Sequence, residues 1–198
     1  VFADHYERLE IVAESRLTDA SVISRDIGVD VEGSATITAK LTGPTGDPSI
    51  TGSIGVDGVR LPAGRWTEVT GRYSLDELVS RTEGSVLLVG NGPAGETRVE
   101  TEIVIGKQKL ELRGIRAAAP GAKVEGQIQV PYAGLPMAGR LEASVNNIGP
   151  WTETFVSGVS SGQVDGAVEF AEVKGLQQIR LTAMAQALSI RAGTIRPM

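Results

Sequence analysis

The sequence contains no cysteine and only one histidine, His5, in its 198 residues. The absence of cysteine excludes disulfides and thiolate metal sites, and one histidine excludes histidine clusters for zinc. A Ser-His-acid triad would have to use His5, which lies in the terminal segment and is predicted to be solvated. The residue types on which much catalysis depends are therefore scarce.

Positive charge and long apolar runs are also in short supply. Lys and Arg number 19 against 24 Asp and Glu, which gives a net charge of -5. A phosphate backbone needs clustered cations, and the sequence has no such cluster, so we expect no nucleic-acid partner. No apolar run approaches the ~20 residues that span a bilayer as a helix, so we expect no membrane span.

Glycine and proline are abundant, with 25 and nine residues, and they occur with many Thr, Ser and Val residues. This composition is typical of short strands joined by tight turns, and it favours an all-β fold. Alternating side chains predict strands at 8–15, 35–42, 97–105 and 178–185, and an uninterrupted apolar strand is predicted at 85–89. Further strands are expected at 50–59, 65–73 and 188–195. Ser74 and Glu77 have the spacing of a capping box, which predicts one short helical turn over 74–81.

The chain contains two similar halves. Residues 118–145 read as a Pro-Gly turn, a strand, a Gly-Leu-Pro break and a second strand, and residues 31–56 have a similar layout. Paired landmarks follow in the same order: Leu9-Glu10 with Leu110-Glu111, Val31-Glu32-Gly33 with Val124-Glu125-Gly126, and Trp66-Thr67-Glu68 with Trp151-Thr152-Glu153. We therefore expect two domains, 1–106 and 107–198, with the boundary at Gly106-Lys107-Gln108-Lys109. Each half is predicted to be an antiparallel β-sandwich.

The runs PGAKVEGQIQV and GLPMAGRLEASV, with GSATITAKLTGPTGDPSITGSI in the first half, resemble the opening strands of macroglobulin-type and bacterial Ig-like repeat domains. The shared pattern is a Pro-Gly turn, an alternating strand, a Gly-x-Pro break and a second strand, and it covers about a quarter of each half. The resemblance implies two tandem Ig-like β-sandwiches that serve as spacer, adhesive or assembly modules, and it carries over no catalytic residue.

Residues Gly90 to Gly95 match the G-x-G-x-x-G pattern of dinucleotide-binding loops. Such a loop must open a helix whose N-terminus faces the pyrophosphate. Here Pro93 lies within the loop and an alternating strand follows it. We interpret the motif as a hairpin loop, with no cofactor.

Acidic residues provide the other candidate chemistry. Asp26, Asp30, Asp47 and Asp57 include oxygen ligands that calcium accepts, but they lack EF-hand spacing and are interpreted mainly as turn residues. Glu100 and Glu102 alternate with Arg98 on one strand face, which is typical of a solvated surface rather than of a general acid/base pair.

Two aromatic residues occupy matching positions in the halves. Trp66 and Trp151 are predicted to share a packing role, and the alternative is a pair of carbohydrate platforms. Tyr132, Leu135 and Met137 form a locally apolar loop that is the best candidate for an interaction patch.

The N-terminal strand has an apolar face made by Leu9, Ile11 and Ala13. It is predicted to be the first strand of its own domain, and the alternative is donation to the open sheet edge of a neighbouring molecule.

From these features we expect a non-enzymatic structural or assembly protein of the cell surface or extracellular space, such as part of a filament, surface layer or multidomain stalk. Its partners would be copies of itself or neighbouring domains. The alternative is a binding or spacer module of a larger secreted protein or enzyme. The start at Val1 is expected for a chain that has lost a signal peptide or forms part of a longer protein.

Overall fold

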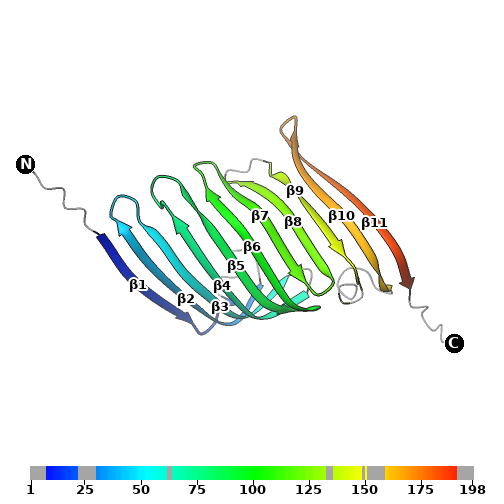
Figure 1. Ribbon diagram of the computed structural model, residues 1–198, viewed down its shortest axis with the longest axis horizontal. Coiled ribbons are helices and arrows are strands. Elements are labelled where there is room, and N and C mark those ends of the chain that lie inside the picture. The colour runs from blue at the N-terminus through cyan, green and yellow to red at the C-terminus, as the bar shows by residue number, and fades with distance from the viewer. Residues whose placement is uncertain are drawn as a thin grey trace, which may run out of the picture.

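The computed structural model describes residues 8–21, 30–61, 64–132, 136–148, 150 and 159–190, with the side chains of 159, 160 and 188–190 excepted. These residues form one antiparallel sheet of 11 strands, in which the order of the strands in space is their order in the chain. Strand β1 lies at one edge and β11 at the other (Figure 1). The all-β class expected from the sequence is therefore confirmed.

Most strands are long and are joined by short turns. Their bounds are Arg8–Leu17 (β1), Asp30–Pro44 (β2), Ser49–Leu61 (β3), Gly64–Asp76 (β4), Thr82–Gly92 (β5), Gly95–Ile105 (β6), Lys109–Ala119 (β7), Ala122–Pro131 (β8), Ala138–Val145 (β9), Val159–Val173 (β10) and Leu176–Ile190 (β11). No helix among the described residues has the length and apolar character to cross a bilayer.

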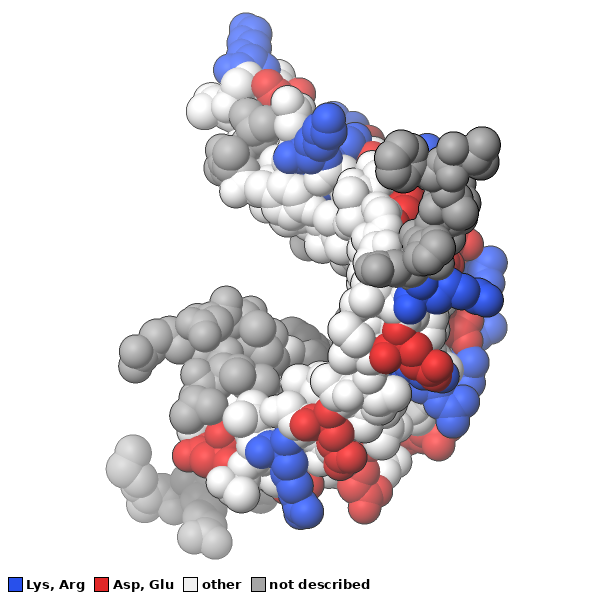
Figure 2. Space-filling view, turned by 90° about the vertical axis from the view of Figure 1, so that its left-hand side faces the viewer, with Lys and Arg blue, Asp and Glu red and all other residues white. Residues whose placement is uncertain are grey.

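Bulges interrupt the pairing of several strands and accompany their bending. The register shifts between Glu32 and Ala35 in β2, between Thr67 and Thr70 in β4, and between Leu112 and Ile115 in β7. Each interval contains a residue with positive φ: Gly33 at 75°, Glu68 at 52° and Gly114 at 55°. A bulge bends its strand and increases the local twist, so the sheet curves into an open trough with a C-shaped outline (Figure 2).

The turns explain two of the expected features. Residues 90–95 form the hairpin between β5 and β6, with Gly92 paired to Gly95, which confirms the hairpin interpretation of the glycine motif. The helical turn expected over 74–81 is formed only in part: the hydrogen bond from Arg81 N to Glu77 O (3.2 Å) closes a single α-turn, while Ser74 belongs to β4 and caps no helix. Ser74 does not cap a helix because its backbone pairs with Thr51 of β3 and Ser85 of β5.

The two sandwiches expected from the sequence are not confirmed. Strand β6 pairs directly with β7 across the hairpin at Gly106, whose N–H donates to Lys109 O (2.9 Å), so the described strands of both halves belong to one sheet. The only buried apolar cluster among the described residues joins Ala20, Val31 and Ala35. The chain exposes 13657 Å² of surface, whereas a compact monomer of this mass would expose about 8,900 Å². The sheet is a single layer.

Candidate functional site

The two faces of the sheet differ sharply in chemistry. One row of directly paired residues crosses all eleven strands without a polar side chain: Ile11, Leu41, Ile50, Leu75, Gly84, Ile103, Leu112, Ile128, Gly139, Phe170 and Ile179. A second row on the same face contains only aliphatic residues and glycine: Ile37, Ile54, Gly71, Leu88, Val99, Ala117, Val124, Ala143, Gly166 and Ala183.

The opposite face carries the charges. A paired row between the two apolar ones contains Glu14, Thr38, Ser53, Arg72, Leu87, Glu100, Arg116, Glu125, Glu142, Ala167 and Thr182. In Figure 2, Lys, Arg, Asp and Glu gather on the outer side of the C and the inner side is largely free of them. The apolar rows therefore line the concave face of the trough.

The candidate site is the part of this concave face that spans β3 to β8. It is a groove of about 530 Å³, with Val59, Trp66, Leu88, Val99 and Val124 among the residues that line it. Six strands at ~4.8 Å spacing make the groove roughly 24 Å long across the strands. The strands that form its floor have hydrogen-bonded neighbours on both sides, so their backbone groups are already used within the sheet.

Two aromatic side chains lie across glycines of neighbouring strands and thereby shape the concave face. Trp66 lies so close to Gly92 that a Cβ there would collide with its indole. Tyr73 lies over Gly52 in the same manner, and its hydroxyl donates to Thr38 O (2.9 Å). Trp66 therefore packs against β5 at Gly92 and lines the groove. Trp151 lies outside the described residues.

Comparison of the chain with family models, with curated proteins and with solved structures finds no match. The expected likeness to Ig-like repeats therefore stays a prediction from the turn pattern.

The charged face carries several ion pairs between neighbouring side chains. Glu32 accepts hydrogen bonds from Arg60 (Nη2, 2.8 Å) and Arg65 (Nε, 2.6 Å), and these bonds, that of Arg60 first, hold the pKa of Glu32 below its usual range. Glu111 lies between Lys109 and Arg113 on the same strand, and their hydrogen bonds, that of Lys109 first, likewise lower its pKa. Each of the two carboxylates is thus held by two cationic side chains.

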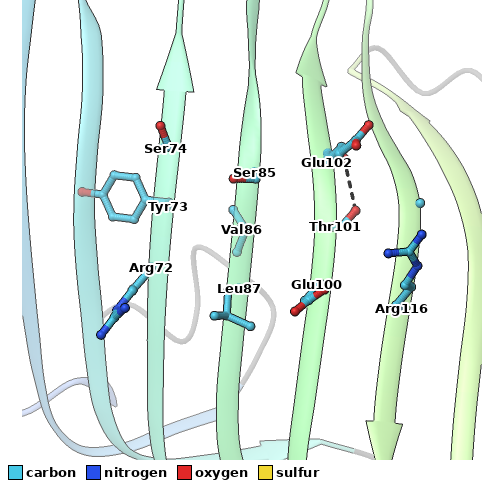
Figure 3. Close-up of a pocket in the computed structure, with 11 residues that line it drawn as sticks. Arg72, Tyr73, Ser74, Ser85, Val86, Leu87, Glu100, Thr101, Glu102 and Arg116 are labelled. Carbon is cyan, nitrogen blue, oxygen red and sulfur yellow. Dashed lines mark hydrogen bonds between the residues drawn. The ribbon is translucent and has the colours of Figure 1, made fainter.

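A hollow of about 420 Å³ lies over β4 to β7 (Figure 3). Arg72 is paired with Leu87, Leu87 with Glu100, and Glu100 with Arg116 on four successive strands. Thr101 Oγ1 donates to Glu102 O (3.1 Å). Glu100 is held by Arg98 Nε (2.7 Å) and both side chains are exposed, as expected for a solvated pair. The hollow contains no nucleophile joined to a base.

The aspartates considered as calcium ligands are placed apart in separate roles. Asp47 accepts hydrogen bonds from Ser80 Oγ (2.6 Å) and Val79 N (3.0 Å), which join two turns and lower its pKa. Asp57 accepts from Ser34 N (2.7 Å) at the β2 bulge, and Asp30 lies 3.6 Å from Arg60 Nε. Asp26 is outside the described residues. Within the described ranges, no group of three or more His, Asp or Glu side chains is arranged to hold a metal ion.

The sequence-predicted interaction patch is only partly described. Tyr132 is exposed at the end of β8, and Met137 is tied to β11 because its N–H donates to Gln177 Oε1 (2.6 Å). Leu135, like His5, is outside the described residues. Among the described residues, no recorded contact joins Tyr132 to Met137.

The N-terminal strand lies at the sheet edge. Leu9, Ile11 and Ala13 belong to β1, share one face and pair with β2 of the same chain. Sequence reasoning identified this apolar face and those of the later strands correctly. It missed that together they form one open groove.

Proposed function

We propose that this chain is a non-enzymatic binding module whose concave face holds an elongated hydrocarbon, such as the acyl chain of a lipid. The observation that carries the proposal is the apolar row that crosses all eleven strands from Ile11 to Ile179 without a polar side chain. Each methylene moved from water into an apolar site contributes about 0.8 kcal/mol when fully buried. Shielding this face also lowers the free energy of a trough whose apolar side chains are for the most part only half-buried.

An apolar peptide fits the same groove less well than a hydrocarbon does. A peptide carries an N–H and a C=O at every residue, and burying them without partners is costly. The groove floor between Val59 and Val124 offers almost no polar side chain, and its backbone groups are used within the sheet. A hydrocarbon chain makes no such demand.

The function expected from the sequence, a surface-located structural or assembly module, is compatible with this proposal. A ligand between the two walls of the trough would also supply the two-layered packing that a sandwich has. The feature that favours assembly is the exposed β11 edge.

Titration with a fluorescent fatty acid, cis-parinaric acid, tests the proposed function. We expect saturable binding, and we expect Leu88→Glu to weaken it at least tenfold because a carboxylate would then lie in the groove. The matched control is Leu87→Glu, the preceding residue of β5, which faces the charged side and should leave the affinity within twofold. Equal losses in both variants, or no saturable binding, would overturn the proposal.

A further inference from the structure

The two edges of the sheet are unequal. Edge strand β1 carries four charged residues in ten, Arg8, Glu10, Glu14 and Arg16. Edge strand β11 carries one, Arg180, in fifteen. Charges on an edge strand oppose pairing with another sheet, so β1 is protected and β11 is not.

The side chains of β11 are also unusually exposed for their type. Ile179 is 61% exposed, Leu181 is 72% exposed and Met184 is 64% exposed. On the concave side, Ile179 and Ala183 are the last members of the two apolar rows. The apolar face therefore runs to this edge, and among the described strands β11 has a neighbour on one side only.

We propose that β11 pairs antiparallel with β11 of a second copy of the chain, about a two-fold axis perpendicular to the sheet. Such an axis reverses the strand direction and keeps the concave faces on the same side. The strands alternate in direction, so β1 and β11 run the same way. Joining β11 to β1 of the next copy with the troughs in line would require parallel pairing, which is slightly less stable per residue.

The sequence of β11 specifies a register for this pairing. Its regular part ends before Ala187, whose φ of 51° marks a break, so the usable segment is 176–186. A ladder that uses all of this segment is centred on Leu181, which then faces Leu181 of the second copy. In the same register Ile179 faces Ala183 and Arg180 faces Thr182, so no like charges are directly opposed. The two-fold contact is self-complementary and closed, which gives a dimer rather than a filament.

A single cysteine at the proposed axis is the sharpest test, because the natural sequence has none. Directly opposed residues of an antiparallel pair have Cα atoms about 4.5–5.5 Å apart, within the range of about 4.4–6.8 Å that a disulfide requires. We expect Leu181→Cys to form a covalent dimer on mild oxidation. Val12→Cys, at the opposite edge and equally exposed at 72%, is the matched control and should stay monomeric on a denaturing gel.

Sedimentation equilibrium of the unmodified chain completes the test. We expect twice the monomer mass, and we expect Leu181→Lys to raise the dissociation constant at least tenfold by placing two ammonium groups opposite each other. Val12→Lys should change it less than twofold, and circular dichroism should show that both variants remain folded. A monomer at all concentrations, an open polymer series, or cross-linking through Val12→Cys in place of Leu181→Cys would each overturn the proposed dimer.

Discussion

Glycines on the concave face allow large side chains to lie flat against the sheet. At Gly52 in β3, the space that a Cβ would fill is taken by the Tyr73 hydroxyl and by the carbonyl of Thr38. In the same strand Gly55 faces the other side and has open space where a Cβ would be. Neither glycine has a positive φ, so the difference between them is one of packing.

We expect Gly52→Ala to destabilise the fold by about 1–3 kcal/mol, because the added methyl would collide with the Thr38 carbonyl oxygen and with the Tyr73 side chain. Gly55→Ala is the matched control and should be neutral or slightly stabilising, since it adds no clash and restricts the unfolded chain. Urea unfolding followed by tryptophan fluorescence measures both. Equal effects would show that Tyr73 does not depend on the space over Gly52.

The Glu32 pair on the charged face predicts a pH dependence of stability. The hydrogen bonds from Arg60 and Arg65 lower the pKa of Glu32 from 4.5. A carboxyl with a lowered pKa in the folded state contributes stability above its ordinary pKa, and this stability is lost as the pH falls through the folded value.

Below about pH 4.5, the unfolding midpoint of the natural chain should therefore fall more steeply with pH than that of Glu32→Gln. The control is a variant in which Arg60 and Arg65 are both replaced by Gln, which removes the hydrogen bonds that lower the pKa of Glu32 and should give the profile of Glu32→Gln. Thermal unfolding between pH 3 and 6, at about 0.1 M salt to keep screening constant, measures the difference. Parallel profiles for the natural chain and Glu32→Gln would contradict the assigned role of the two arginines.

At the scale of strands, alternation in the sequence predicted which residues share a face. Thr97, Val99, Thr101, Ile103 and Ile105 lie on one face of β6, because side chains alternate along an extended chain. Alternation did not predict that Val104, on the other face, is buried while Ile105 is exposed. The hairpin at 90–95 could also be read from its glycines and proline. What alternation could not provide is the partner of each apolar face, since a strand that packs on a second sheet and a strand that lines an open groove have the same pattern.

The hairpin between β6 and β7 distinguishes one continuous sheet from two separate domains. Trypsin should cut after Lys107 in this hairpin rather than after Lys109, whose ammonium is held by Glu111 (2.9 Å) and Gln129 (2.8 Å). Because β6 and β7 are paired from Arg98 with Ala118 to Ile105 with Leu110, the two fragments should elute together on gel filtration and separate only in urea.

The control for this cleavage is Lys107→Gln, which should resist the cut under the same conditions. Two fragments that elute apart and each give a folded β spectrum would instead support the two-domain arrangement expected from the sequence. That arrangement followed from the paired landmarks, which mark recurring turns and do not specify where the sheet ends.

At the scale of the whole molecule, the single layer leaves an unusual amount of surface in water. The unfolded chain would expose about 30,000 Å², and a compact monomer would bury about 21,000 Å² of it. With 13657 Å² still exposed, this fold buries about 16,000 Å². The few large aromatic residues, 4% of the sequence, were the one signal of a thin core, and composition alone does not convert that signal into an open trough.

The denaturant dependence of unfolding should reflect this difference, because the m-value scales with the surface exposed on unfolding. We expect a urea m-value about a fifth to a quarter below that of a compact protein of equal length. The measurement uses Leu181→Lys, so that dissociation of a dimer does not contribute. An m-value equal to that of compact proteins would mean that the trough is closed in solution.

The agreement between chain order and strand order has a kinetic consequence. Since each described strand pairs only with its predecessor and its successor, strand pairing closes only the segment between two consecutive strands, and such local pairing favours fast folding. The energetics approach those of a one-dimensional chain of nearest-neighbour couplings, as in repeat proteins. Such a ribbon can nucleate at any hairpin and zip outward, and it frays from its ends, so amide exchange should be fastest in β1 and slowest in the central strands.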